Sequence, residues 1–387
     1  MKRNQPRTTR EGLCGLWLIL IFLALGLAAC SKPEEKAWRP GMPLAREQVK
    51  IGVLYPNRDH GSSGWDYSHY SGIEAMRREL GLREDQIVHH FNVSEGDPEV
   101  MKSMVRDCIR DGAKIIIATS WDFMEPCEEL AAEFPGVVFA NATGTKYNQT
   151  NFTNYYARFY DARYLSGIVA GLKTQTGKVG LVAAMGKDNN EVCCGINAFA
   201  LGVEKVNPGA QVYVRVTYNW FDPMGETVAA NSLIADGCDV IAQDTDSSAP
   251  ILAAQGAGVW GIGYNTDMSL EAPEAVITSV IYHWEVYYTL LVRSVIDGTF
   301  TTAPYLGSLT DGMVDITDIA AELATLGMAE KIAAERQRII SGAFNVFDGV
   351  METNDGLFIG KEGKTLEDSE IFGNMHWYYR NVVESGQ

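Results

Sequence analysis

The chain has 387 residues, which is enough for two domains of ordinary size, each with its own core. Its formal net charge is −17, from 32 basic and 49 acidic residues. An acidic surface of this size argues strongly against nucleic-acid binding and against electrostatic adhesion to anionic lipid.

The first thirty residues have the layout of a secretory signal. Basic residues come first, an apolar core spans 13–27, and Ala28-Ala29-Cys30 follows. This ending resembles a bacterial lipobox, so we expect residues 1–29 to be a lipoprotein signal peptide, Cys30 to carry lipid and residues 30–48 to form a tether. A single membrane-spanning helix is the alternative, but the apolar run falls short of the ~20 residues that a span needs.

Five cysteines remain after Cys30, and an odd number outside the cytosol leaves at least one thiol unpaired. We expect these cysteines to be mainly buried small apolar residues, with a bridge between Cys108 and Cys127 as an alternative. Neither the cysteines nor the histidines show a zinc-ligand spacing.

Short β-branched runs alternate with longer amphipathic segments along the rest of the chain. In chain order, the pattern predicts strands at 50–55, 113–118 and 136–140 and helices at 71–82 and 126–134. The alternation restarts after a turn-rich join near 143–156, with predicted strands at 178–182, 211–217, 239–242 and 259–263. This order is typical of parallel sheets covered by helices on both faces. The predicted fold class is therefore α/β, with two doubly wound parallel-sheet lobes.

Aromatic and acidic side chains follow the predicted strands at their carboxyl ends. In such sheets, ligands bind beyond these ends, and two facing lobes can share one cleft. The residues that follow the strands include Trp65, Asp66, Trp121, Trp220, Phe221, Asp246, Asn265 and Asp267.

Aromatic rings offer flat faces, and carboxylates and amides offer hydrogen-bond acceptors for the edge of a ligand. Together they suit a flat, nitrogen-rich heterocycle, for which stacking contributes ~1–3 kcal/mol per base and charge-assisted hydrogen bonds add more. Each tryptophan taken alone is explained as well by core packing, but three of them at successive strand ends favour a ligand site.

Other kinds of site find less support. Asp244 and Asp246 are alternate carboxylates, but no EF-hand continuation follows them, and we predict no metal and no cofactor. Residues 61–64 lack the phosphate-binding Gly-rich pattern. No serine or cysteine lies in a nucleophile-elbow context beside His60 or His69, so we predict no catalytic residue and no enzyme activity.

From about residue 49 to residue 374, the chain resembles the basic membrane lipoprotein family of ABC-transporter substrate-binding proteins, which includes the purine-nucleoside receptors. The segments that carry the resemblance are weak alone but specific in their order and spacing: residues 64–67 with Gly72, residues 197–202, 220–223, 243–247 and 263–268, and residues 340–342 with 347–349. At Asp244, one branch of the family has a histidine.

The resemblance implies a type I periplasmic-binding fold with several hinge crossings, near Tyr155, Thr278 and Thr302. Lobe 1 would span 49–155 plus about 281–303, and lobe 2 would span 156–280 plus part of 304–387. The ligand would be a purine base or nucleoside that the protein hands to a membrane permease.

By alignment with the family, Trp65 takes the place of the ring that stacks on the purine, and Asp66 that of a neighbouring asparagine. Trp121 would contact the base, and Trp220 or Phe221 would cover its opposite face. From the second lobe, Asp246 and Asp267 would hold the ligand, with Asn265 beside them.

One departure from the family concerns ribose. Nucleoside-binding members place a lysine shortly after the segment that corresponds to Thr278-Ser279, but this chain continues Val280-Ile281-Tyr282-His283-Trp284. We therefore favour a free purine base such as adenine over a nucleoside.

The resemblance implies a monomer, anchored by lipid in the cell envelope, on the periplasmic side in a Gram-negative cell. Hinge closure around the ligand would present the closed form to the ABC permease. Two alternatives remain open: a sensor that presents the same closed form to a membrane signalling partner, and an envelope hydrolase that acts on nucleosides.

Overall fold

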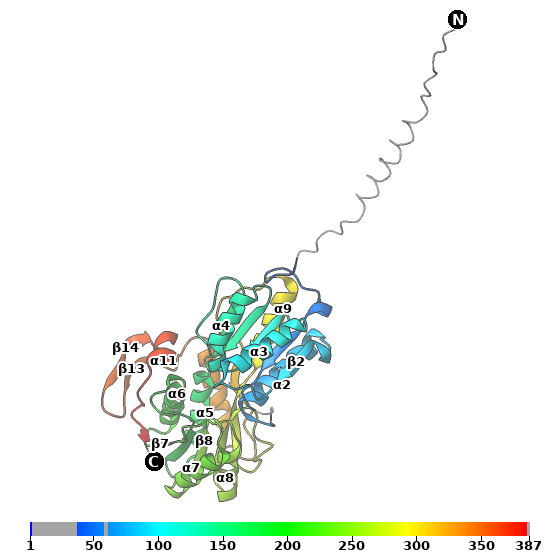
Figure 1. Ribbon diagram of the computed structural model, residues 1–387. Helices are drawn as coiled ribbons and strands as arrows, with labels where there is room; N and C mark the ends of the chain where they lie inside the picture. Colours follow the sequence, from blue (N-terminus) through cyan, green and yellow to red (C-terminus); the bar gives the residue numbers. More distant parts are fainter. Residues whose placement is uncertain (2–36, 58–60, 385–387) are drawn as a thin grey trace. The chain divides into compact units, whose positions relative to one another are not determined.

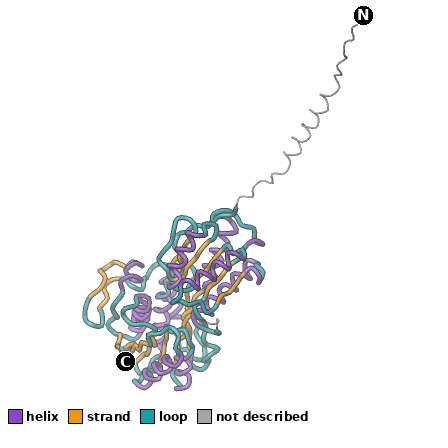
Figure 2. The backbone as a smooth tube through the Cα atoms, viewed as in Figure 1, coloured by secondary structure: helices purple, strands orange, loops and turns teal. Residues whose placement is uncertain are grey.

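The computed structural model describes residues 1, 37–57 and 61–384. The compact part of the chain, from Arg39 onward, is built on two helix-covered sheets, which we call the first and second lobes (Figures 1 and 2). The predicted signal peptide, the lipid attachment at Cys30 and most of the tether lie outside the described residues. No helix among the described residues has the length and hydrophobicity needed to cross a bilayer.

The first lobe contains a parallel sheet with strand order β11-β5-β4-β3-β1-β2. Its strands are β1 (Ile51–Leu54), β2 (Ile87–His90), β3 (Ile115–Ala118), β4 (Val138–Ala142), β5 (Phe152–Ala157) and β11 (Tyr305–Gly307). Its helices pack in two pairs, α2 (Gly64–Leu80) with α9 (Trp284–Asp297) and α3 (Pro98–Arg110) with α4 (Met124–Glu133). Strands β1, β3 and β4 are buried along their whole length, as expected for a sheet with helices on both faces.

The second lobe repeats this plan around a sheet with strand order β12-β10-β9-β8-β6-β7-β15, parallel except for the β10–β12 pair. Its strands are β6 (Lys178–Ala183), β7 (Gln211–Val216), β8 (Val240–Gln243), β9 (Trp260–Asn265), β10 (Val276–Tyr282), β12 (Val314–Ile316) and β15 (Val382–Glu384). Helix α5 (Tyr160–Lys173) packs against α6 (Asn190–Val206), and α7 (Pro223–Ala235) packs against α8 (Ala249–Ala257). Two doubly wound α/β lobes are therefore present, as the sequence predicts.

Within the described residues, the chain passes from one sheet to the other three times: between β5 and α5, between β10 and α9, and between β11 and β12. Arg158 lies in the first crossing, and its backbone N–H donates to the carbonyl of Gly307, next to the third crossing, at 2.6 Å. The first and third crossings therefore lie beside one another, which is an arrangement that lets two lobes move about a common hinge. The proposed lobe limits and the hinge motion stay predictions.

The C-terminal segment contains α10 (Met328–Ile340), the hairpin β13 (Asp348–Glu352) and β14 (Phe358–Thr365), and α11 (Asp368–Asn374). The hairpin forms a sheet of its own beside the second lobe (Figure 1). Asp368 accepts two hydrogen bonds from the Arg158 guanidinium, at 2.9 and 2.6 Å, which ties this segment to the first crossing.

Helix α2 begins seven residues before the predicted start of residue 71. Its N-terminal residues, Gly64 and Trp65 onward, read as a loop because glycine, serine and aromatic residues favour helices weakly. Packing against α9 stabilises the extra turns, because Gly72 lets the α9 backbone approach closely. Trp65 and Asp66 therefore lie on the first turn of a helix.

The structure overturns the bridge considered between Cys108 and Cys127, since both are free thiols. The side chain of Cys127 is fully buried in the first-lobe core, and the sulfur of Cys108 lies 3.0 Å from Nε2 of His90. The other three described cysteines are buried and free as well, which confirms the view of these residues as small apolar core residues.

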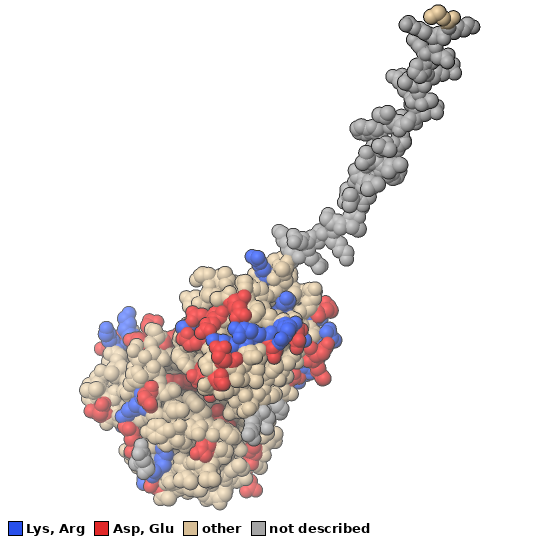
Figure 3. All heavy atoms as spheres, viewed as in Figure 1, with Lys and Arg blue, Asp and Glu red and all other residues tan. Residues whose placement is uncertain are grey.

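Acidic and basic side chains are paired on the surface of α3 and α4, where Figure 3 shows both colours side by side. Lys102 and Arg106, one turn apart on α3, contact Glu129 and Glu133, which have the same spacing on α4. These ion pairs join the two helices on the outside of the first lobe.

Candidate functional site

A cavity of about 270 Å³ lies between the lobes, beyond the carboxyl ends of their strands. The first lobe contributes Pro56, Asn57, Trp65, Glu95, Thr119, Ser120, Trp121 and Thr143, and the second contributes Glu191, Asn219, Trp220, Phe221, Asp246 and Tyr264. Five of the eight predicted ligand-binding residues are among these: Trp65, Trp121, Trp220, Phe221 and Asp246. Their role in binding a ligand stays a prediction.

The half-buried indole of Trp65 is fixed from behind. Its Nε1–H donates to the carbonyl oxygen of Thr119 at 2.7 Å. Its ring lies nearly perpendicular to those of His69 and Trp284, at centroid distances of 4.3 and 5.4 Å. A ring held in this way needs little ordering when a ligand arrives, which lowers the entropic cost of binding.

His69 is completely buried behind Trp65, and burial lowers its pKa well below the usual value. Its Nδ1 lies 2.5 Å from the hydroxyl of Tyr288, which in turn lies 2.9 Å from that of Tyr155. Its ring stacks on Trp284. His69 is therefore a neutral packing residue that supports the cavity wall.

Asp66 lies next to Trp65 but is not among the residues that line the cavity. Its side chain is buried, and its Oδ2 accepts a hydrogen bond from the backbone N–H of Asn57 at 2.9 Å. Asn57 does line the cavity, so Asp66 fixes the loop that leaves β1.

Trp121 opens a 3-10 turn, Trp121–Phe123, directly after β3, and its side chain is 50% exposed. The preceding residue, Ser120, donates its hydroxyl to Glu95, which comes from the loop after β2. Trp121 therefore lines the cavity with a ring that is only half covered by protein.

The second lobe presents two loops to the cavity. Trp220 and Phe221 lie in the loop between β7 and α7, and Asp246 lies in the loop between β8 and α8. The backbone N–H of Asp246 donates to the carbonyl of Trp220 at 2.8 Å, which joins the loops. Gly64 approaches from the first lobe so closely that a Cβ at this position would overlap the carbonyl oxygen of Asp246.

Asn265 and Asp267 have different surroundings. Asn265 ends β9, is buried and donates from Nδ2 to Oδ1 of Asp246 at 2.8 Å, so it orients a cavity carboxyl group. Asp267 is exposed, and its side chain accepts from the backbone N–H of Ser269 at 2.9 Å. It is not among the residues that line the cavity.

The cavity carboxyl groups hold protons more tightly than usual. Burial raises the pKa of Glu191 to about 7, although the hydroxyl of Tyr156 donates to it. Burial, with Asp66 and Glu226 nearby, raises the pKa of Asp246 well above its usual range. A protonated carboxyl group both donates and accepts hydrogen bonds, so these groups can match a ligand edge that carries both kinds of partner.

Sequence reasoning missed Glu95 and Glu191. Glu95 follows β2, a strand that is hard to recognise because two histidines end it. Glu191 lies in the first turn of α6, a few residues after β6. The predicted site draws on the residues that follow five of the seven predicted strands, and those after 136–140 and 178–182 are not among them. Looking beyond every strand as far as the following helix would have found Glu191.

The described residues include no group of three or more histidine, cysteine or acidic side chains placed to hold a metal ion. The cavity lining among these residues contains aromatic rings, hydroxyl groups, amides and carboxyl groups, without lysine or arginine. These groups are suited to hold a small polar ring by stacking and hydrogen bonding.

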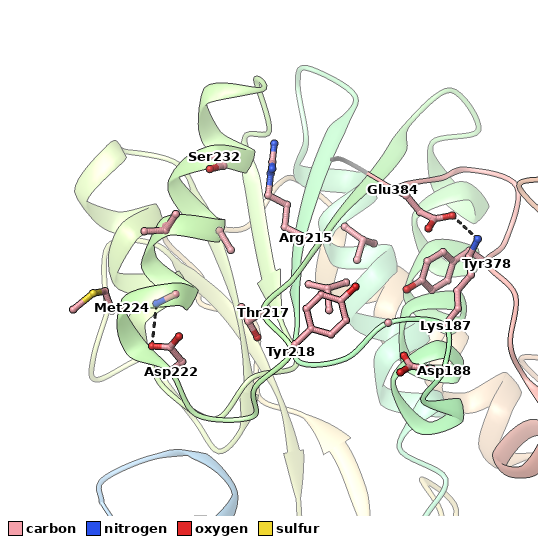
Figure 4. A pocket seen from close by; sticks show the side chains of 16 residues that line it. Lys187, Asp188, Arg215, Thr217, Tyr218, Asp222, Met224, Ser232, Tyr378 and Glu384 are labelled. Carbon is pink, nitrogen blue, oxygen red and sulfur yellow. Dashed lines mark hydrogen bonds and ion pairs between the residues drawn. The ribbon is translucent and has the colours of Figure 1, made fainter. Parts of the chain in front are cut away.

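A larger, open hollow of about 1030 Å³ lies on the second lobe (Figure 4). It is bordered by α7 on one side and by Tyr378 and the Lys187–Glu384 ion pair on the other. Tyr218 projects into it from the loop that also carries Trp220. The smaller cavity is the better ligand site, because strand ends from both lobes converge on it.

The comparisons with known proteins agree with this architecture. The chain matches the family described as Bmp, ABC transporter substrate-binding protein PnrA-like, over residues 48–346. It is 34% identical to a purine-binding protein of Brucella abortus over 345 residues, which cover 88% of this chain and 95% of that one.

Two further relatives extend the comparison. A protein of Haloferax volcanii, whose name provisionally assigns it to glucose binding in an ABC transporter, is 31% identical over 80% of this chain and 76% of its own. A solute-binding protein of an ABC transporter from Conexibacter woesei has the same fold, with a TM-score of 0.64, 20% identity and coverage of 77% of this chain and 98% of that one. The chain belongs to the Bmp family of PnrA-like ABC transporter substrate-binding proteins.

Proposed function

We propose that this protein captures a purine base between its lobes and delivers it to an ABC permease, with adenine favoured over its nucleoside. The observation that carries the proposal is the interlobe cavity, in which tryptophan rings from both lobes accompany carboxyl groups. Its volume, about 270 Å³, lies below the roughly 300–1,000 Å³ of pockets for drug-sized ligands, which favours a base without ribose.

Adenine suits the hydrogen-bonding groups of the cavity. Its edge alternates ring nitrogens, which accept, with N–H groups, which donate. Glu191 can meet both kinds of group, because its pKa of about 7 leaves part of its carboxyl population protonated near neutral pH. Burial raises the pKa of Asp246 in the same direction. Stacking between Trp65 or Trp121 and the rings of the second lobe would add ~1–3 kcal/mol per face.

A monosaccharide is a second candidate. Trp65 and Trp220 could also stack on the apolar face of a sugar, and carboxyl groups such as Glu95 could accept its hydroxyl hydrogens. The Haloferax volcanii relative, named for glucose, favours this alternative.

Titration calorimetry with adenine, adenosine and glucose separates these ligands. We expect adenine to bind most tightly. Adenosine binding tenfold tighter than adenine would show that ribose contributes to recognition. Binding of glucose but of neither purine would show that the ligand is a sugar.

Chromatography after prolonged incubation with adenosine tests the hydrolase alternative, for which free adenine would accumulate.

As a family member, the protein works outside the cytoplasm, and we propose that lipid on Cys30 retains it at the membrane. Replacing Cys30 by alanine should release the protein from the membrane fraction and abolish labelling with a radioactive fatty acid. A Cys30 variant that stays in the membrane fraction and is still labelled would contradict the anchor.

Co-purification of the ligand-loaded protein with a permease, or with a membrane kinase instead, distinguishes transport from sensing.

A further inference from the structure

Glu226 is a completely buried carboxyl group that does not line the cavity. It lies in the first turn of α7, four residues after Asp222, the residue that caps this helix. Burying a carboxyl group is costly unless hydrogen bonds satisfy both of its oxygens. Both oxygens of Glu226 have such partners, and the partners come from two different loops.

One oxygen serves the loop that follows β7. The backbone N–H of Asp222 donates to Oε1 of Glu226 at 2.9 Å, and the N–H of Glu226 donates back to the carbonyl of Asp222 at 2.8 Å. Asp222 directly follows Trp220 and Phe221, so this reciprocal pair fixes the end of the loop that carries the second-lobe rings of the cavity.

The other oxygen serves the loop that follows β8. The hydroxyl groups of Thr245 and Ser247 donate to Oε2 of Glu226, at 2.9 and 2.6 Å. These two residues flank Asp246 on either side. The carboxyl group of Glu226 therefore lies between the two second-lobe loops and holds both.

We propose that Glu226 is a positioning residue for ligand binding, which sets the distance between the ring-bearing loop of Trp220 and Phe221 and the carboxyl group of Asp246. This inference rests on the proposed function, because it assigns the two loops to one ligand. No other described side chain is shown to bond both loops through its own oxygens, although the Asp246-to-Trp220 backbone bond assists it.

A double-mutant cycle tests the proposal by calorimetry with adenine. Ser247→Ala, which removes one hydrogen bond between Glu226 and the loop after β8, should weaken binding roughly tenfold, and Glu226→Ala, which removes the bonds to both loops, should weaken it further. The double variant should bind adenine little more weakly than Glu226→Ala alone, because the bond that Ser247→Ala removes is already lost in Glu226→Ala. Glu330→Ala, an exposed acid in the first turn of α10, is the matched control and should bind as the native chain does.

Glu226→Gln supplies a readout that a purely structural role would not move. Removing a negative charge that lies near Asp246 lowers the pKa of Asp246, so the pH midpoint of adenine binding should shift to lower pH. A variant with a lower melting temperature but with unchanged affinity and an unchanged pH midpoint would overturn the proposal.

Hydrogen exchange without any ligand separates this proposal from the choice of ligand. In Glu226→Ala, the amide of Asp222 and those of residues 244–248 should exchange faster, while those of residues 119–121 stay as protected as before. If Glu226→Ala does not fold, Thr245→Val combined with Ser247→Ala removes the two bonds between Glu226 and the loop after β8 and leaves the bond to Asp222 in place. Unchanged exchange in both loops would contradict the role of Glu226, whereas faster exchange in a protein that binds no purine would contradict only the proposed ligand.

Discussion

The orientation of the Trp65 indole is fixed by the residues that surround it. The hydrogen bond to Thr119 and the perpendicular rings of His69 and Trp284 fix its indole before any ligand arrives. Such a ring can recognise a planar ligand with little loss of side-chain entropy.

Trp65→Ala should therefore weaken adenine binding by about 2 kcal/mol, the typical loss of one stacking face. Calorimetry measures the change. Trp260→Ala is the control. Trp260 is the first residue of β9, whereas Tyr264 and Asn265 are its last two, and Trp260 does not line the cavity. Equal affinity of the Trp65 variant and the native chain would make this ring a purely structural one.

Gly64 lies where the first lobe closely approaches the second. Its φ of +82° is in the region that favours glycine, and a Cβ would overlap the carbonyl oxygen of Asp246 in the opposite lobe. Gly64→Ala should hinder closure, weaken adenine binding roughly tenfold and give a larger radius of gyration in X-ray scattering with adenine present.

Gly258→Ala is the matched control for Gly64→Ala. Gly258 has a φ of +69°, and a Cβ there would meet nothing within 4 Å. This variant carries the same kind of backbone strain without a contact between lobes. If both variants bind and scatter alike, strain rather than closure accounts for the effect.

At the scale of whole elements, α5 and α6 make an unusually close helix pair. Gly167 on α5 and Gly202 on α6 each leave room for a carbonyl oxygen of the other helix, from Phe199 and Tyr164 respectively. Because α5 follows the first crossing, this pair fixes the second lobe to the hinge.

Gly202→Ala should destabilise the fold by about 2 kcal/mol. Alanine improves helix propensity by about 1 kcal/mol, but the overlap with the Tyr164 carbonyl forces the helices apart at a larger cost. Urea unfolding measures the difference. Gly209→Ala is the control, because a Cβ there meets nothing within 4 Å, and it should leave the urea midpoint nearly unchanged. A Gly202→Ala variant with the native free energy of unfolding would show that the two helices can move apart at no cost.

At the scale of the whole molecule, the raised pKa of Glu191 links stability to pH. Its pKa is about 7 in the folded chain against 4.5 when exposed, so the folded state binds more protons between these values. Stability attributable to Glu191 is therefore greatest below pH 4.5 and falls as the pH rises through 7.

Glu191→Gln removes this ionisation. Between pH 5 and pH 8, the free energy of unfolding of the native chain should fall relative to that of the variant by on the order of 2 kcal/mol, allowing for partial solvent screening. Urea denaturation at both pH values measures it. Parallel pH profiles of the two proteins would show that Glu191 ionises normally when folded.

The sequence predicted the two lobes because buried strands such as β1 and β3 are short apolar runs that no polar residue interrupts. It did not predict β2, where His89 and His90 lie on a partly exposed strand, or β5, whose residues read as a join between domains. A hydrophobic pattern predicts strands that are buried on both faces. It does not predict strands such as β2 and β5, which form because they pair with a neighbouring strand.

Chain order alone was enough to bring Trp65, Trp121, Trp220 and Asp246 to one cavity, because parallel strands end on the same edge of their sheet. The tertiary structure decided which acids accompany them. Asp267 faces solvent, Asp66 on α2 bonds the loop after β1, and Glu191 joins the cavity from the start of α6. Direction and burial of a side chain depend on how elements from distant parts of the chain pack, and local sequence does not encode that packing.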